Sequence, residues 1–322
     1  MFERLPTAPT SQELIDRAFR RSKKAGKSVK GWKREVLMLT TAGNIISDNL
    51  DNLVRKYPSF ENLPPFYYDL VDALVGVDNM RIHLSRVGWA SKEARSLTRE
   101  HLRSIKRSPD KATIRKAAFG RMASVLKSID SDLVFLNEAR KKLRKMPSVN
   151  PELPTVIVAG YPNVGKSSFL ISVTGARPEI ASYPFTTKGI VVGHFNRGAQ
   201  RYQVVDTPGL LDRPLSERND IELQAIAALH HLQGVILYIL DPCEHCGFSL
   251  EDQLSLLTDV RSWLQLPVLV AANKADLVQD LSRYEDVDLS MSTLTGKGVS
   301  EVLDNLVELL DRVEKAKGNS EE

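Results

Sequence analysis

Residues 155–169 read TVIVAGYPNVGKSSF, and this stretch decides the fold of the second half of the chain. The apolar, β-branched run at its start predicts a buried strand. GYPNVGKS at 160–167 then fits the phosphate-binding pattern G-x-x-x-x-G-K-S between a strand and a helix. Gly160 and Gly165 let the backbone turn closely enough for amide N–H groups to point at phosphate oxygens. A glycine-containing turn with no ligand is the alternative, and the complete motif in this context argues against it.

The last two residues of the motif predict how phosphate and metal are held. The amine of Lys166 is expected to neutralise charge on the β- and γ-phosphates, and the hydroxyl of Ser167 to ligate Mg²⁺. DTPG at 206–209 ends another strand candidate, YQVVDT. We expect Asp206 to hold Mg²⁺ through water and the amide of Gly209 to sense the γ-phosphate.

ASYPFTTKG at 181–189 precedes the second strand candidate and contains two threonines. One of them is expected to close over Mg²⁺ and the γ-phosphate, and of Thr186 and Thr187 we favour Thr187.

NKAD at 273–276 predicts which base is bound, because it follows the apolar strand candidate PVLVAA. The amide of Asn273 can both accept and donate at the base edge. The carboxylate of Asp276 can accept from guanine N1–H and N2–H₂, which adenine lacks. Lys274 is expected to lie along the base with its aliphatic stem, and SMST at 290–293 to offer a backbone amide to guanine O6.

These motifs follow one another in order, each at the end of a strand candidate, and together they predict a GTPase that converts GTP to GDP and phosphate. The predicted nucleotide-binding residues are Gly160, Tyr161, Pro162, Asn163, Val164, Gly165, Lys166, Ser167, Ser168, Asp206, Thr207, Pro208, Gly209, Asn273, Lys274, Asp276, Ser292 and Thr293. The predicted metal-binding residues are Ser167, Thr187 and Asp206. The predicted catalytic residues are Lys166, Thr187, Asp206, Gly209 and Asn163.

One departure bears on the rate of hydrolysis. Ras-like GTPases place a water-orienting Gln directly after the D-x-x-G element, where this chain has Leu210 and Leu211. A leucine cannot orient water, so we expect slow intrinsic hydrolysis. Asn163 is a candidate for helping to bind K⁺ beside the phosphates, and the alternative is that Asn163 only stabilises the loop.

The second half of the chain predicts an α/β doubly wound P-loop GTPase domain with a mostly parallel six-stranded sheet. Several of its short strand candidates are apolar throughout, as strands buried on both faces are. The candidates are residues 155–160, 189–195, 202–207, 234–240, 267–272 and 287–292.

The first half predicts an all-α helical bundle, because apolar residues recur there at three- and four-residue spacing. Thr10, followed three positions later by Glu13, predicts a capping box at the start of the first helix. The predicted helices are 13–25, about 33–57, 66–75, about 77–107 and about 110–145. The predicted division is a basic helical domain at 1–147, a Pro-rich linker at 148–154 and the GTPase domain at 155–322.

The net charge of +4 over 322 residues divides sharply between the halves. Residues 1–150 carry 30 Lys and Arg against 16 Asp and Glu, whereas residues 151–322 carry 14 against 24. The basic half predicts a polyanionic partner, with nucleic acid favoured. No apolar run approaches the ~18 residues of a membrane span, and neither a secretory signal nor a disulfide framework is visible. We expect a cytoplasmic protein without a membrane partner.

The residues also carry a family resemblance. YPFTTKGI (183–190) and DTPGLLDRP (206–214) resemble the Obg-related translation GTPases. TAGNIISDNLDNLV (41–54), KYPSFENLPPFYYDLVDAL (56–74), TREHLRSIKR (98–107) and DPCEHCGFSLEDQ (241–253) resemble the nucleolar GTP-binding protein (Nog) family. The resemblance implies a helical N-terminal domain, a guanine-nucleotide domain and a role in assembling the large ribosomal subunit on rRNA. The chain is similar to the short archaeal form, so nucleolar targeting is not carried over.

The resemblance makes the rRNA of a large-subunit precursor the expected partner, and DNA is not expected. Arg95, Arg99, Arg103 and Arg107 form a stripe at four-residue spacing, and a second cluster comprises Arg20, Arg21, Lys23, Lys24, Lys27 and Lys30. Both could instead be solvated helix faces. Two rival functions stay open. One is a GTPase partner in tRNA modification, and the other is a scaffold that binds rRNA and holds GTP with little turnover.

Two further features, a cysteine-containing segment and a set of aromatic residues, are assigned structural rather than ligand-binding roles. Cys243, His245 and Cys246 supply too few ligands for a zinc site, and a pair of loop thiols is favoured. The aromatic residues of the first half could stack on bases, but core packing is favoured for them; they are Trp32, Phe66, Tyr67, Tyr68 and Trp89. No catalytic role is assigned to His230 or His231.

Overall fold

The fold is described from a computed structural model covering residues 2–146, 148–174, 179–181, 190–278 and 286–318. The chain divides into two compact units. The first comprises residues 1–62 and 74–144, and the second residues 63–73 and 145–322. Residues 63–73, which the sequence-based boundary assigns to the helical domain, therefore group with the second unit.

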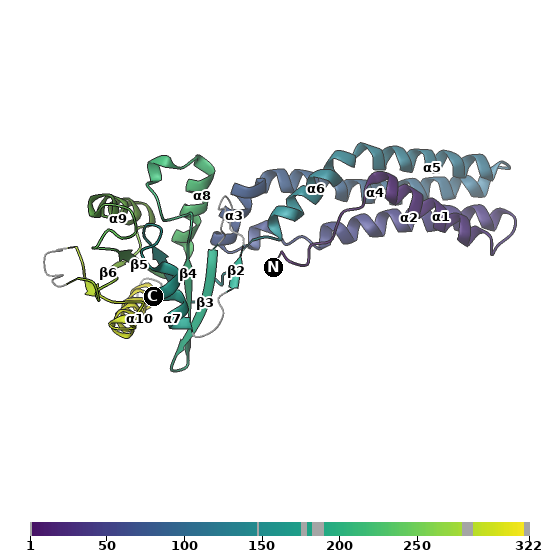
Figure 1. The fold of residues 1–322 in the computed structure, drawn as a ribbon. Helices are drawn as coiled ribbons and strands as arrows, with labels where there is room; N and C mark the ends of the chain where they lie inside the picture. Colours follow the sequence, from purple (N-terminus) through teal and green to yellow (C-terminus); the bar gives the residue numbers. More distant parts are fainter. Residues whose placement is uncertain (1, 147, 175–178, 182–189, 279–285, 319–322) are drawn as a thin grey trace. The chain divides into compact units, whose positions relative to one another are not determined.

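The first unit is a bundle of long helices lying side by side (Figure 1). Its elements are α1 (Ser11–Gly26), α2 (Trp32–Arg55), a short 3₁₀ turn η1 (Phe60–Asn62), α4 (Val77–Arg107), α5 (Lys111–Ser128) and α6 (Asp130–Leu143). Helix α3 (Pro65–Val75) begins in the second unit. The core contains fully buried residues such as Leu14, Leu39, Leu50 and Met122.

Helix α1 begins where the sequence places its capping box. The hydroxyl of Thr10 accepts from the amide of Glu13, and the Glu13 carboxylate accepts from the amide of Thr10. These two bonds satisfy N–H groups that the first turn of a helix leaves without partners.

The single helix predicted over 110–145 is wrong, because the structure divides it at Ile129. There φ is −106° and ψ is 12°, outside the helical region, and α6 starts afresh at Asp130. Ile129 is fully buried, and Asp130 Oδ1 accepts from the amide of Ser11 at the start of α1. Tertiary contacts set this break, and no Gly or Pro marks it in the sequence.

The second unit is a doubly wound sheet in the order β2-β3-β4-β1-β5-β6-β7. The strands are β1 (Thr155–Ala159), β2 (Glu179–Ala181), β3 (Ile190–Arg197), β4 (Gln200–Asp206), β5 (Gly234–Leu240), β6 (Val268–Ala272) and β7 (Leu289–Ser290). Pairing is parallel from β4 through β7 and antiparallel at β2–β3 and β3–β4. The predicted fold class is confirmed. The described part of the sheet has seven strands, one more than predicted, because β2 was not foreseen.

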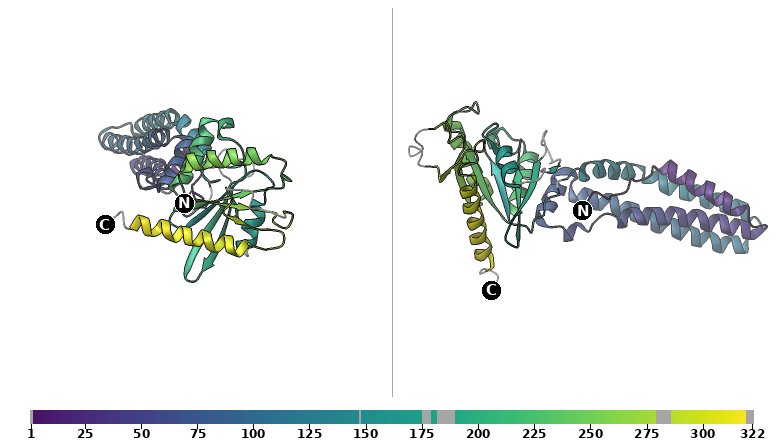
Figure 2. Two further views of the ribbon diagram at one scale, coloured as in Figure 1. Left: turned by 90° about the vertical axis from the view of Figure 1, so that its left-hand side faces the viewer. Right: turned by 60° about the horizontal axis from the view of Figure 1, so that its bottom comes forward.

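Helices cover both faces of this sheet (Figure 2). Helices α7 (Lys166–Thr174) and α10 (Val299–Gly318) contact one face, and α8 (Asp220–Ala228) and α9 (Leu250–Leu264) pack together on the other. Short 3₁₀ turns η2 (Leu215–Glu217) and η3 (Leu229–His231) flank α8. Strands β1 and β5 are buried along their whole length, which explains their uninterrupted apolar sequence. No helix among the described residues is both long and apolar enough to span a bilayer.

Candidate functional site

The loop between β1 and α7 has the conformation that its glycines predict. The backbone φ is +131° at Gly160, +64° at Asn163 and +108° at Gly165. A Cβ at Gly160 would lie 2.5 Å from the carbonyl oxygen of Ile239, and one at Gly165 would lie 2.1 Å from Asn273 Nδ2. Both positions need a positive φ and have a neighbouring atom where a Cβ would lie, and only glycine satisfies both conditions.

The side chain of Lys166 is held inside the loop that it ends. Its amine donates to the carbonyls of Gly160 and Tyr161, each at 2.7 Å, and the residue is buried. These contacts curl the loop around the amine, which places a fixed positive charge at the start of α7 beside the amide groups of the first helical turn.

Ser167 and Asp206 come together although they are 39 residues apart. The Ser167 hydroxyl donates to Asp206 Oδ2 at 2.7 Å, because α7 begins beside the end of β4. Asp206 is fully buried, and its Oδ1 has no hydrogen-bond partner. Burial raises the pKa of Asp206, while the Ser167 hydroxyl and the Lys166 amine partly oppose that shift. An unpartnered buried carboxylate oxygen beside a hydroxyl fits a hard divalent cation such as Mg²⁺.

Asn273 connects three parts of the site. Its Nδ2 donates to the carbonyl of Val164 at 2.8 Å and to Thr293 Oγ1 at 3.1 Å, and its Oδ1 accepts from the amide of Thr293 at 2.9 Å. The side-chain amide of Asn273 therefore links the phosphate loop to the SMST segment. The sequence did not predict this positioning role.

The SMST segment uses both candidate amides inside the protein. The amide of Ser292 donates to the carbonyl of Lys297 at 2.8 Å, and that of Thr293 donates to Asn273 Oδ1. A bond from Thr293 to guanine O6 therefore requires giving up the bond to Asn273. Asp276 lies three residues after Asn273 in the chain and is exposed.

Lys274 is anchored by a residue that sequence reasoning missed. Its amine lies 2.5 Å from Asp241 Oδ2, and Asp241 is fully buried at the end of β5. The same carboxylate accepts from the amides of Cys243 and Cys246. The position of Asp241 directly after an apolar strand candidate was the sequence signal that could have identified it. The thiol-bearing loop thus contributes to the site by holding Lys274, and burial raises the pKa of both thiols.

The loop after β4 also contains residues that the sequence did not single out. Leu210 and Leu211 are buried, so neither side chain points to solvent where a nucleophilic water would be. The amide of Gly209, where φ is +78°, donates to Asp212 Oδ2 at 2.7 Å. Arg218 contacts both Asp212 and the carbonyl of Gly209.

The other predicted residues are placed as follows. Tyr161 is buried and packs against Phe248 with ring centroids 4.2 Å apart, and the Thr207 hydroxyl donates to the carbonyl of Val158. Pro162 and Pro208 are half-buried, and Asn163 and Ser168 are exposed. Thr186 and Thr187 lie outside the described residues.

The basic residues of the first unit differ in their contacts. Arg95 pairs with Asp51 and, at 3.5 Å, with Asp48, so it is engaged within the bundle. The rest of the stripe and the second cluster are exposed; they are Arg99, Arg103, Arg107, Arg20, Arg21, Lys23, Lys24, Lys27 and Lys30.

The basic ends of several helices meet at one end of the bundle. Arg115 at the start of α5 pairs with Glu35 at the start of α2. The α1–α2 and α4–α5 connections are therefore neighbours, at the right-hand end of Figure 1. Residues 20–30 and the C-terminal turns of α4 therefore lie at the same end of the bundle.

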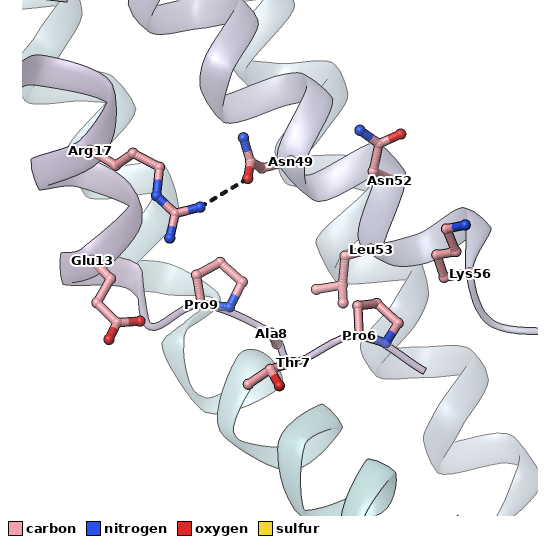
Figure 3. Close-up of a pocket in the computed structure, with 10 residues that line it drawn as sticks. All are labelled: Pro6, Thr7, Ala8, Pro9, Glu13, Arg17, Asn49, Asn52, Leu53 and Lys56. Carbon is pink, nitrogen blue, oxygen red and sulfur yellow. Dashed lines mark hydrogen bonds between the residues drawn. The ribbon is translucent and has the colours of Figure 1, made fainter. Parts of the chain in front are cut away.

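The aromatic residues divide between core and surface. Phe66 and Tyr67 are buried, as favoured for them, whereas Trp32 and Trp89 are each 50% exposed. A cavity of about 370 Å³ lies between residues 6–9 and the helices α1 and α2 (Figure 3). Arg17 and Lys56 line it, and the Arg17 guanidinium donates to Asn49 Oδ1 at 3.3 Å. Over the described ranges, no group of three His, Cys, Asp or Glu residues is arranged to hold a metal.

Comparison with known protein families gives two matches. Residues 2–150 match the model described as NOG1 N-terminal helical domain, and residues 220–276 match that described as Nucleolar GTP-binding protein 1 (NOG1).

Individual relatives cover most of the chain. An uncharacterized protein of Methanocaldococcus jannaschii is 42% identical over 87% of this chain and 82% of its own length. Nucleolar GTP-binding protein 1 of Drosophila melanogaster is 33% identical over 94% of this chain and 50% of its own length. A solved structure of a nucleolar GTP-binding protein 1 from Plasmodium falciparum is 38% identical, with a TM-score of 0.47 over 55% of this chain and 96% of that chain.

The chain spans about half the length of the Drosophila relative. The two model matches and the breadth of the sequence identity agree with each other and with the helical and doubly wound units of the structure. The chain belongs to the nucleolar GTP-binding protein 1 (NOG1) family.

Proposed function

We propose that this chain is a GTP-binding and GTP-hydrolysing switch that binds rRNA and acts in assembly of the large ribosomal subunit. The observation that carries the nucleotide half is the contact between Ser167 and the buried Asp206, beside the Lys166 amine. The relatives are named nucleolar GTP-binding proteins, which supports both the nucleotide and the setting.

In this proposal Ser167 and Asp206 hold Mg²⁺, with Thr187 joining them when GTP is bound. When bound there, Mg²⁺ would offset the negative charge of the nucleotide's phosphates. Lys166 adds a second positive charge. Because the amine is already fixed by two carbonyls, little side-chain freedom remains to be lost when phosphate binds.

Guanine selection is assigned to Asn273 and Asp276. We expect Asp276→Ala to weaken GTP binding by roughly 10- to 100-fold, because two N–H donors of the base lose a charged acceptor. Asp304→Ala is the matched control, since Asp304 is an exposed carboxylate on α10 that pairs with Arg197. Equal affinity of the wild-type chain for ATP and GTP in a titration with Mg²⁺ would contradict the proposal.

Hydrolysis is proposed to be slow, because Leu210 and Leu211 are buried and supply no group that can orient water. Asn163 adopts a left-handed backbone and is exposed at the loop, which fits a role in binding K⁺ beside the phosphates. Hydrolysis would release Thr187 and the loop after Gly209.

The rRNA half of the proposal rests on the first unit. Its exposed arginines and lysines gather at one end of the bundle. Such cations bind phosphates and position a protein on RNA without reading its sequence. We place the protein in the cytoplasm, where reducing conditions keep Cys243 and Cys246 as thiols.

Two alternatives have their own signatures. A scaffold that holds GTP with little turnover would bind large subunits equally with any nucleotide, whereas a partner in tRNA modification would not bind them. Association with large subunits that depends on the nucleotide favours the switch.

A further inference from the structure

The loop after β4 is closed on itself by one carboxylate. Asp212 Oδ2 accepts from the amide of Gly209 at 2.7 Å, and the Asp212 side chain is only 16% exposed. This amide is the donor of the DTPG motif that is expected to sense the γ-phosphate. An intramolecular anion thus occupies the donor at which an anionic phosphate is expected.

A buried arginine holds that carboxylate in place. Arg218 Nη2 lies 3.3 Å from Asp212 Oδ1, and Nη1 donates to the carbonyl of Gly209 at 2.6 Å. The Arg218 side chain is fully buried, and its Nε has no partner. The guanidinium therefore joins both ends of the turn, and its burial strengthens the pairing because water does not screen it.

The closed turn is attached to the phosphate loop. The carbonyl of Leu211 accepts from the amide of Gly160 at 3.0 Å, and the amides of Leu210 and Leu211 donate to the carbonyl of Thr207. Moving Gly209 away from Asp212 therefore disturbs a turn that is bonded directly to the phosphate loop.

We propose that Asp212, positioned by Arg218, determines how strongly the site distinguishes GTP from GDP. The inference rests on the proposed function. One N–H cannot donate at full strength to two anions, and a carboxylate and a γ-phosphate at the same donor repel each other. GDP leaves the bond between Gly209 and Asp212 intact, whereas GTP must break it. The carboxylate thus lowers the affinity for GTP selectively.

The test compares affinities for GDP and for a non-hydrolysable GTP analogue, with Mg²⁺, on the full chain. Asp212→Asn removes the negative charge that competes with the γ-phosphate. Its neutral amide oxygen is a weaker acceptor for the Gly209 N–H than a carboxylate is. We expect the ratio of analogue affinity to GDP affinity to rise at least tenfold, which is about 1.4 kcal/mol. Arg218→Lys keeps the charge but cannot hold both Gly209 and Asp212, and it should shift the ratio in the same direction by less.

Glu217→Gln is the matched control. Glu217 is an exposed carboxylate of the same loop. Its charge is near enough to the phosphate loop to contribute to the raised pKa of Tyr161, after burial and the charge of Asp252. The Glu217→Gln variant removes one negative charge near the site and leaves the contacts of Gly209 unchanged. Its ratio of analogue affinity to GDP affinity should therefore stay within twofold of the wild-type ratio. Melting curves and retained GDP binding establish that each variant is folded.

Two results overturn the inference while leaving the proposed function intact. The first is an affinity ratio in Asp212→Asn that equals the wild-type ratio; if that variant does not fold, an unchanged ratio in Arg218→Lys counts in its place. The second is a rise of the ratio in Glu217→Gln as large as that in Asp212→Asn. A wild-type chain that binds neither nucleotide overturns the proposed function itself, and the competition at Gly209 with it.

Discussion

Asp206 illustrates how one residue can favour function at the expense of stability. Its carboxylate is buried with one oxygen unpartnered, and burial raises its pKa above the usual value. Folding therefore disfavours the ionised form. The stability associated with this group is fully present below the pKa of the unfolded chain and is lost as the pH rises through the higher pKa of the folded chain.

Replacing this carboxylate by an amide should separate stability from binding. We expect Asp206→Asn to raise Tm by about 2–4 °C at pH 7 without nucleotide, because a buried charge is removed. The gain should shrink as the pH is lowered toward the range where Asp206 protonates. The variant should also lose Mg²⁺-dependent nucleotide binding. Thermal melts from pH 4 to pH 8 and nucleotide titrations measure both effects, with the exposed Asp304→Asn as control. A lower Tm at pH 7 together with intact binding would contradict this account.

Asn163 carries a second prediction at this scale. If its side chain helps to bind K⁺, GTP turnover should be about tenfold faster in KCl than in NaCl at equal ionic strength, because a cation beside the phosphates offsets charge in the transition state. Asn163→Ala should remove the difference while leaving GDP affinity within a few-fold. Equal wild-type rates in the two salts would exclude the role and leave Asn163 as a loop-stabilising residue.

The sequence predicted that Lys166, Ser167 and Asp206 belong to one site, and the structure brings these three residues together. Lys166 bonds to carbonyls of its own loop, and Ser167 meets Asp206 because parallel strands end at the same edge of a sheet. Asp212 and Arg218 could not be predicted, because each acts through a loop closure that no spacing rule describes. Asp241 was missed although it directly follows an apolar strand candidate.

At the scale of elements, predictions held where periodicity is local and failed where tertiary packing decides. The apolar runs of β1 and β5 predicted buried strands, and the capping box predicted the start of α1. The break at Ile129 was missed, since a buried isoleucine gives no signal for a helix end. Strand β2 was missed because it has three residues and, among the strands that the structure describes, pairs with β3 alone.

Replacing a helical glycine by alanine is expected to change the stability in opposite directions at Gly43 and Gly120. A Cβ at Gly43 in α2 would lie 2.0 Å from Thr98 Oγ1 of α4, whereas one at Gly120 in α5 meets nothing within 4 Å. We expect Gly43→Ala to lower the stability by about 1–3 kcal/mol through overpacking. Gly120→Ala should raise it by about 0.5–1 kcal/mol through helix propensity. Chemical denaturation measures both, and a Gly43→Ala variant as stable as wild type would show that α2 and α4 are not packed as described.

At the scale of the whole molecule, the net charge of +4 conceals two chemically distinct units. The basic first unit carries exposed cations, and the acidic second unit carries the phosphate loop. The charge division was visible in the sequence, whereas the grouping of residues 63–73 with the second unit was not. That grouping depends on contacts such as the bond from the Tyr67 hydroxyl to the carbonyl of Val149 at 2.6 Å.

If the first unit binds RNA through phosphates, its affinity must fall with salt. We expect at least a tenfold loss in affinity for an rRNA fragment between 50 and 200 mM KCl, since released counterions drive such binding. Replacing Arg99, Arg103 and Arg107 with Gln should reduce the salt slope. Arg95→Gln is the matched control, because Arg95 is already paired with Asp51. Affinity that does not change with salt would argue against phosphate contacts.

The central claim is that guanine nucleotide controls association with a ribosome precursor. Its most direct test is cosedimentation of the full chain with large ribosomal subunits in the presence of a non-hydrolysable GTP analogue or GDP, each with Mg²⁺. Because the γ-phosphate and Mg²⁺ are expected to order the loop after Gly209, the account predicts at least a tenfold difference in the fraction bound between the two nucleotides. Equal association with both nucleotides, or no association with either, would contradict it.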